Sequence, residues 1–420
     1  MALTDTPGRA RFTNRTLAIM AAALWITAAA LAGVYLYDGA GSDMAAPSVS
    51  SVALAASTTL RVTVTTAPFT TVTRPTGPPS TTTRSTVRPT TTPTTEPPPL
   101  TVAAGGDVLG DRGVGQFMDD RGGEAVFAKI APFLRTASVA FVNLEGPISD
   151  KGTRASWKEY TFRARPALTR GLASAGIDVV SLANNHSVDY GPAALIETIA
   201  RLDDAGVSHA GAGADAAAAS APALLITPAG IVAVLAFTDI IPGGFAATAD
   251  APGVNATEPN RKKILAAVAA AKRKADFVIV SFHWGTEYKP QAGGEQRELA
   301  HQVVDAGADL VIGHHPHVIQ GLELYRNRVI AYSLGDFVWD HYSRETGETF
   351  VLRVTLRPRG QPSVEAVPVY LDGTSGVPGP VTGAEADVIL TRLAKLSADL
   401  GLQLTLSGDR ALLGAVAATP

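Results

Sequence analysis

Three of the protein's eight histidines fall within four positions, His314, His315 and His317, at the end of an apolar run. Neutral imidazole is the commonest protein metal ligand, and Pro316 restricts the backbone so that the last two rings can face a common site. The run before them, residues 308–312, is typical of a strand buried on both faces. Ligands of open α/β sheets bind beyond the carboxyl ends of strands, so the cluster predicts a metal or ligand site. A solvated polar loop is the alternative.

Polar side chains also follow four other predicted strands, at residues 101–105, 139–143, 177–182 and 277–282. The side chains that follow them are Asp107, Glu145, the Asn184-Asn185-His186 run and His283. Carboxylate and amide oxygens mixed with imidazole nitrogens suit Mn²⁺, Fe or Zn²⁺ better than Mg²⁺. Two such ions about 3.5–4 Å apart would clamp a phosphoester and activate a water. The pattern predicts a centre of one or two divalent ions.

Each of these residues also has an interpretation without metal. Asp107 could cap a helix or turn, and Glu145, before Gly146-Pro147, could be a turn carboxylate. Asn185 and His186 could form an Asx-turn and a surface imidazole, and His283 could be a core histidine bonded to backbone. The conjunction of five strand ends favours the metal site.

The elements that would position these residues alternate between strand and helix. A further strand is expected at residues 231–237, and several predicted helices end in Ala-Gly, where glycine stops the helix in the left-handed conformation. This alternation of strands with glycine-terminated helices indicates an α/β layered domain from about residue 100 to the C-terminus. Residues 328–334, 350–356 and 364–370 predict strands of a second sheet. A final helix is expected at 384–399.

The N-terminal 37 residues predict a membrane anchor. Arg9, Arg11 and Arg15 precede an apolar segment at 16–37, whose roughly 33 Å length as a helix matches the hydrocarbon core. The positive-inside rule places the N-terminus in the cytoplasm and the main domain outside a single-pass cell-membrane anchor. A cleaved signal peptide, with a small-residue site at residues 30–32, is the alternative.

Residues 38–99 predict a disordered linker, because threonine and proline dominate from residue 64 onward and no periodicity is present. The chain has no cysteine, which excludes disulfides and thiolate ligands. A net charge of −3 and a pI near 6.3 argue against nucleic acid as a partner.

Six segments, in this order, resemble the CapA family of bacterial poly-γ-glutamate capsule proteins. They are Gly106-Asp107-Val108, Asn143-Leu144-Glu145, SLANNHSVDYG (181–191), FHWGTE (282–287), GHHPHVIQ (313–320) and YSLGDF (332–337). The resemblance covers nearly all of residues 100–370. It implies a calcineurin-like metallophosphoesterase fold, a sandwich of two mixed sheets flanked by helices.

The resemblance also implies roles for individual residues. His186 would face the substrate as the catalytic histidine, oriented by Asp189. The implied metal ligands are Asp107, Glu145, Asn185, His283, His315 and His317. The residues assigned to substrate binding are Arg112, Asn184, Glu287, His314 and Asp336.

Two positions depart from the pattern. The wider superfamily has a histidine two residues after the first aspartate, where this chain has Leu109, so one metal lacks a nitrogen ligand. Asp336 stands where CapA relatives more often carry asparagine, and this extra carboxylate could bind metal or weaken the binding of an anionic substrate.

The sequence thus predicts a membrane-anchored, extracytoplasmic protein that makes, releases or remodels an anionic cell-surface polymer such as poly-γ-glutamate. Metal-dependent hydrolysis of an ester or amide, with His186 protonating the leaving group, is the expected reaction. The alternative is a noncatalytic, polymer-binding component of a capsule synthesis or export complex. Leu109 favours this alternative, and the remaining ligands favour the enzyme.

Overall fold

The computed structural model describes residues 97–257, 261–341 and 343–413. The predicted anchor at 16–37 and nearly all of the predicted linker lie outside these ranges. Within them, no helix is both long enough and apolar enough to cross a membrane.

The larger sheet has ten strands and contains the first strand of the body. Its main path runs β17-β18-β15-β14-β1-β2-β3-β4, with β13 beside β1 and β16 beside β15. Strands β1 to β4 and β13 run parallel, whereas β14 and β15 are antiparallel to their neighbours. The bounds are β1 (Leu100–Val108), β2 (Val139–Leu144), β3 (Val179–Ser181), β4 (Ser208–Ala210), β13 (Asp336–Val338), β14 (Glu348–Leu356), β15 (Ser363–Leu371), β16 (Pro378–Pro380), β17 (Thr405–Leu406) and β18 (Ala411–Leu413).

The smaller sheet has six strands in the order β11-β12-β10-β9-β7-β6. Its four central strands are parallel, and an antiparallel strand lies at each edge. The bounds are β6 (Ala223–Thr227), β7 (Gly230–Thr238), β9 (Phe277–His283), β10 (Leu310–His314), β11 (Leu322–Tyr325) and β12 (Arg328–Ala331); β5 (Ala212–Gly213) and β8 (Gly253–Val254) form a separate pair.

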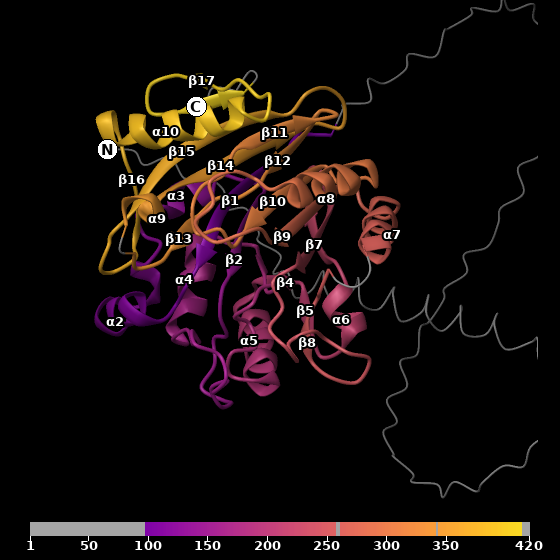
Figure 1. The fold of residues 1–420 in the computed structure, drawn as a ribbon, viewed down its shortest axis with the longest axis vertical. Helices are drawn as coiled ribbons and strands as arrows, with labels where there is room; N and C mark the ends of the chain where they lie inside the picture. The colour runs from indigo at the N-terminus through magenta and orange to yellow at the C-terminus, as the bar shows by residue number, and fades with distance from the viewer. Residues whose placement is uncertain (1–96, 258–260, 342, 414–420) are drawn as a thin grey trace, which may run out of the picture. The chain divides into compact units, whose positions relative to one another are not determined.

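Helices cover the outer faces of both sheets, and a hydrophobic cluster fills the space between the sheets. The larger sheet carries α2 (Arg112–Arg121), α3 (Ala131–Leu134), α4 (Ala167–Ala175) and α5 (Pro192–Ala205), and the smaller sheet carries α7 (Arg261–Lys272) and α8 (Gly294–Asp305). The shorter helices are η1 (Gly123–Ala125), α6 (Ala216–Ser220) and α9 (Arg344–Gly347). Figure 1 shows α8 lying across β9 and β10. The predicted sandwich of two mixed sheets flanked by helices is confirmed.

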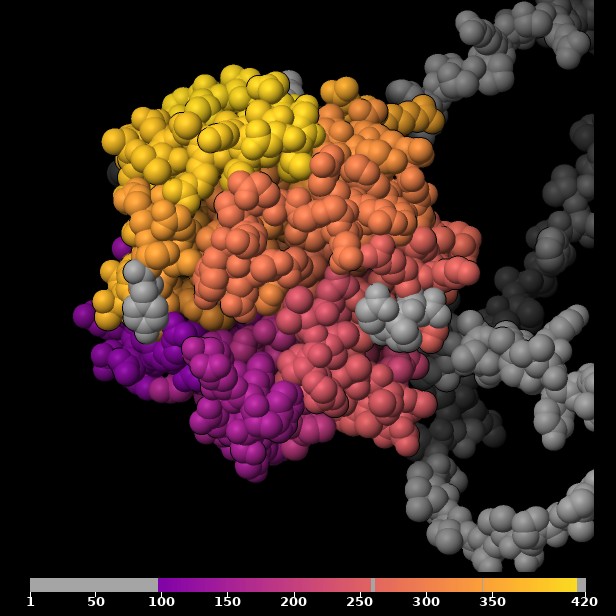
Figure 2. All heavy atoms as spheres, viewed as in Figure 1, coloured from indigo at the N-terminus to yellow at the C-terminus, as the bar shows by residue number. Residues whose placement is uncertain are grey.

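The C-terminal helix α10 (Gly383–Ala398) packs back on the body, as predicted. Its Leu390, Leu393 and Leu396 belong to the cluster between the two sheets. In Figure 2 the C-terminal residues, in yellow, form a continuous cover over one end of the body. This helix therefore closes the sandwich at that end.

The predicted stops of α4 and α5 are confirmed, but the strands predicted at residues 328–334, 350–356 and 364–370 do not form one second sheet, because β12 joins the smaller sheet and β14 and β15 join the larger. Gly176 and Gly206 end α4 and α5 with φ of 80° and 74°. Strands β14 and β15 extend the larger sheet, because β14 pairs antiparallel with β1 from Leu100↔Leu356 onward. A strand's own alternation reports which face is buried and not which neighbour it pairs with.

Candidate metal centre

The carboxyl ends of β1, β2, β9 and β10 meet at one place, and the start of β13 lies beside the end of β1. In the larger sheet Asp107 lies in register with Asn143 of β2 and with Asp336 of β13. In the smaller sheet His283 lies in register with His314. All five side chains are buried. Neighbouring parallel strands thus place residues from distant parts of the sequence side by side.

One group of potential metal ligands consists of Glu145, His283 and His315, whose ligand atoms lie within 4.8 Å of one another. Glu145 Oε1 is 3.7 Å from His283 Nε2. Asn185 Oδ1 is 2.8 Å from the same nitrogen, so the predicted amide ligand lies at this group as well.

A second group consists of Asp107, His317 and Asp336, also within 4.8 Å of one another and all buried. His317 Nδ1 is 2.8 Å from Asp336 Oδ1 and 3.9 Å from Asp107 Oδ2. Asn143 Nδ2 donates to Asp107 Oδ1 at 2.8 Å and lies 3.3 Å from Glu145 Oε2. The asparagine amide therefore joins the two groups.

The residues of both groups fit a divalent metal. Glu145 Oε1 and His315 Nδ1 are buried and have no hydrogen-bond partner among the described residues. A buried polar atom without a partner costs about 1–3 kcal/mol, and a metal ion would satisfy both atoms. Carboxylate, amide and imidazole donors together suit Mn²⁺, Fe or Zn²⁺.

Burial makes the histidines of the first group poor bases. It lowers the pKa of His315 to about 3, assisted by His317, and it lowers the pKa of His283 well below its ordinary value. Burial and the nearby Asp107 charge raise the pKa of Glu145 well above its usual range. Both imidazoles are therefore neutral at pH 7, the form that binds metal.

In the second group the imidazole of His317, and not the Asp336 carboxylate, carries the proton. Burial alone would lower the pKa of His317, but the charge and hydrogen bond of Asp336 outweigh it and raise the pKa to about 10. Burial raises the pKa of Asp336 to about 6. A metal bound here would displace the proton of His317.

His186 and Asp189 lie beside the first group. His186 Nδ1 is 2.6 Å from Asp189 Oδ2, and His186 Nε2 is 4.0 Å from Glu145 Oε1. Lys158 Nζ contacts Asp189 Oδ1, the Asn185 carbonyl oxygen and His186 Nδ1. Burial lowers the pKa of His186 to about 4, with Asp189 opposing and Lys158 adding to the shift.

A cleft of about 780 Å³ opens over the groups. Predicted residues on its wall are Arg112, Asn185, His186, Glu287, His317 and Asp336. Other wall residues, which the sequence analysis did not select, are Lys158, Glu159, Tyr160, Phe162, Tyr288, Trp339, Asp340, His341, Ser343 and Thr346. Glu287 also lies within ligand distance of His315 and His317, although it is exposed.

Two residues predicted to bind substrate lie behind the cleft. Asn184 is fully buried, and its Nδ2 donates to the Leu144 carbonyl oxygen at 2.8 Å. His314 is fully buried, with Nδ1 3.1 Å from Asp107 Oδ1 but not aligned for a hydrogen bond. Neither residue is on the cleft wall. Their positions suit support of the Asn185 loop and of Asp107, and not contact with a substrate.

Lys158 and Asn143 are two site residues with several polar contacts that sequence reasoning did not select. Asn143 is the last residue but one of β2, so its place near a strand end was a usable signal. Lys158 lies in an irregular connection between β2 and α4, and no motif marks it. Its contacts depend on how that connection folds over the strand ends.

The sandwich of two sheets, with carboxylates, an amide and imidazoles gathered at its strand ends, fits the metallophosphoesterase-like fold. Residues 101–341 match the model of the family described as bacterial capsule synthesis protein PGA_cap. The chain belongs to this family.

Curated relatives agree with the family match. The chain is 33% identical to a capsule biosynthesis protein CapA of Bacillus anthracis, over 68% of this chain and 70% of that protein. It is 30% identical to a PGA biosynthesis protein CapA of Bacillus subtilis, over 70% and 78%. A probable polyglutamine synthesis accessory protein of Mycobacterium tuberculosis is 32% identical, over 60% and 78%.

Proposed function

We propose that this protein acts in the synthesis, release or remodelling of an anionic capsule polymer such as poly-γ-glutamate, by metal-dependent hydrolysis of an ester or amide. The observation that carries the proposal is the convergence of buried oxygen and nitrogen ligands beside the cleft, among which Glu145 Oε1 and His315 Nδ1 lack partners. The family match supports the polymer class.

The charges of the cleft support a metal-dependent mode of binding. Its cationic side chains are all paired: Arg112 with Asp340 at 2.7 Å, Lys158 with Asp189 at 2.5 Å, and the protonated His317 with Asp336 at 2.8 Å. The wall also carries Glu159, Glu287 and Asp336. An anionic polymer would meet net repulsion at such a wall, so bound cations are needed to attract its carboxylates.

When bound, a divalent metal lowers the pKa of water and neutralises charge on the reacting oxygen. The chain's own residues orient the substrate and move the proton. Phe162 lies against the His186 ring, with centroids 4.3 Å apart, and Asp189 fixes the ring through Nδ1. His186 Nε2, 4.0 Å from Glu145 Oε1, is then the ring nitrogen that can take up a proton and deliver it to the leaving group.

His186→Ala separates catalysis from binding. Removal of a metal-ligating side chain should abolish metal binding and activity together. Removal of the general acid should leave the metal bound and slow leaving-group departure by about 10²–10⁴-fold. We expect the variant to keep its metal and to lose more rate on substrates with poor leaving groups than on activated aryl esters.

The matched measurement is hydrolysis by the wild-type protein with and without added Mn²⁺ or Zn²⁺. Equal losses on both substrate classes, or loss of metal from His186→Ala, would reject the acid role. If neither protein hydrolyses either class and both restore polymer production in cells, the noncatalytic polymer-binding component is the better account.

We also propose that residues 16–37 anchor the protein in the cell membrane, with the body outside. The support is the apolar run after Arg9, Arg11 and Arg15. Protease added to cells with a permeabilised wall should degrade the body and leave a tag before Arg9 protected. An accessible tag would contradict this topology, and a mature chain starting after Ala32 would replace the anchor with a secretion signal.

A further inference from the structure

Two Gly-Asp sequences lie side by side in adjoining parallel strands. Gly106-Asp107 lies near the end of β1, and Gly335 precedes Asp336 at the start of β13. Asp107 N donates to the Gly335 carbonyl oxygen at 3.0 Å. A Cβ on Gly106 would lie 1.8 Å from that oxygen, and Gly335 itself has φ of 74°. Glycine at positions 106 and 335 therefore allows the two backbones to approach closely, which places Asp107 and Asp336 in register.

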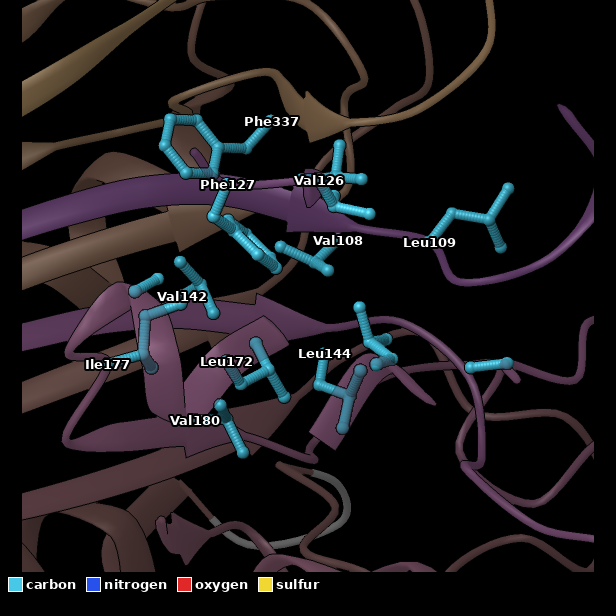
Figure 3. Close-up of a cluster of buried hydrophobic side chains, with 14 of the residues drawn as sticks. Val108, Leu109, Val126, Phe127, Val142, Leu144, Leu172, Ile177, Val180 and Phe337 are labelled. Carbon is cyan, nitrogen blue, oxygen red and sulfur yellow. The ribbon is translucent and has the colours of Figure 1, made fainter. Parts of the chain in front are cut away.

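Position 109 does not contribute to the metal centre. Leu109 is fully buried in the hydrophobic cluster that also contains Val108 and Phe337. Figure 3 shows Leu109 just beyond the arrowhead of β1. Its backbone N–H donates to the Val338 carbonyl oxygen at 2.8 Å, which continues the contact between the two chain segments. The nitrogen ligand that the wider superfamily would have at 109 is thus absent, and a packed leucine occupies its place.

The adjoining strand supplies a potential ligand instead. His317 Nδ1, Asp336 Oδ1 and an Asp107 oxygen lie within 4.8 Å of one another. Metal–ligand bonds of about 2.0–2.2 Å separate the ligand atoms of one ion by roughly 3–4 Å, so small side-chain rotations would complete the set. All three side chains are buried, which favours a bound cation over loosely hydrated carboxylates.

We propose that Asp336 is a metal ligand that replaces the missing nitrogen ligand of position 109. Together with Asp107 and His317 it holds one divalent cation, next to the ion held by Glu145, His283 and His315. Two carboxylates and one imidazole favour Mn²⁺ or Fe²⁺ at this position. The inference rests on the proposed metal dependence, but not on any particular substrate.

The test is the metal content of the purified full chain after incubation with Mn²⁺ and removal of free metal, measured by elemental analysis and titration. Wild type should hold two ions per chain. Asp336→Ala should hold one and bind the second at least about tenfold more weakly. Asp336→Asn, which keeps a neutral amide oxygen, should fall between the two.

Asp340→Ala is the matched control, because Asp340 lies four residues further on, lines the same cleft and pairs with Arg112 instead of a histidine. It should keep both ions. Circular dichroism of each variant reports whether the fold is intact. One ion in wild type, or two ions bound with unchanged affinity in Asp336→Ala, would overturn this inference alone. No ion in wild type would overturn the proposed metal-dependent function as well.

Discussion

The potential oxygen ligands of the candidate metal centre come mainly from the ten-stranded sheet, whereas its potential nitrogen ligands come from the six-stranded sheet. The buried oxygen ligands Asp107, Glu145, Asn185 and Asp336 belong to β1, β13 or the segments that follow β2 and β3. The imidazoles of His283, His315 and His317 belong to β9 or follow β10. Glu287, which follows β9, is the exposed exception. The centre is therefore a junction between sheets, and neither sheet alone carries a complete ligand set.

This division has a consequence for stability as well as for chemistry. A hydrophobic cluster joins the inner faces of the two sheets, but the strand ends meet through polar side chains. His315 N donates to Asp107 Oδ2 at 3.1 Å, and His283 Nε2 contacts Asn185 Oδ1 at 2.8 Å. A bound metal would add bonds across the same junction and so link the sheets more firmly.

The largest expected effect comes from removing one ligand from each sheet. His315→Ala and Glu145→Gln should each weaken metal binding by about tenfold or more, and His315→Ala should leave the fold intact. Because imidazole favours Zn²⁺ and carboxylate favours Mn²⁺, the ratio of Zn²⁺ to Mn²⁺ affinity should fall in the first variant and rise in the second. Competition with a chromophoric chelator measures both affinities. Wild-type affinity in either variant would contradict a shared centre.

A smaller effect is expected on thermal stability. Metal at 100 times its dissociation constant should add about 2.7 kcal/mol to the free energy of unfolding, and this gain should shrink in both Glu145→Gln and His283→Ala. Calorimetry with and without Mn²⁺ measures the gain. The control is Asp204→Asn, at an exposed position of α5, which should keep the full gain. A gain that survives in one ligand variant would show that the metal binds to a single sheet.

The smallest expected effect compares two aspartates at equivalent strand starts. Asp178 and Asp309 each follow an Ala-Gly helix stop, and each accepts a hydrogen bond at 2.8 Å from a neighbouring strand, from Ala140 N and Val278 N. Asp309 also pairs with Lys272 and Arg328. Asp178 lies in the larger sheet, where burial raises its pKa from 3.8 to about 6.

Because the folded protein holds the Asp178 proton more tightly, stability is lost as the pH rises from about 4 through about 6. Asp178→Asn should therefore stabilise the protein at pH 7.5 by about 1–2 kcal/mol, after a discount for solvent screening, and have little effect at pH 4. Asp309→Asn should destabilise it by about 1 kcal/mol at pH 7.5, because it breaks two ion pairs. Urea unfolding at both pH values measures the difference. If both substitutions change the free energy of unfolding at pH 7.5 in the same direction, the contrast between Asp178 and Asp309 is refuted.

Much of this protein was determined by local sequence. Apolar runs predicted the strands that became β1, β2, β7, β9 and β10, and glycine after each helix predicted where α4 and α5 end. The polar residues that follow those strands were also predicted to gather at one edge, and the structure brings Glu145, His283 and His315 together there. Apolar runs and the glycines that end helices are properties of short segments, so they can be recognised in a single sequence.

Strand neighbours and sheet membership were decided only by tertiary structure. Asp336 was assigned to substrate binding, with metal binding as an alternative, and only the pairing of β13 with β1 showed that it lies level with Asp107 and near His317. Lys158 reaches His186 from a connection without a motif, and Asn184 and His314 lie behind the cleft. Pairing between segments more than 200 residues apart depends on which edges and glycine contacts are available when the sheets pack, and the sequence near either segment does not encode that.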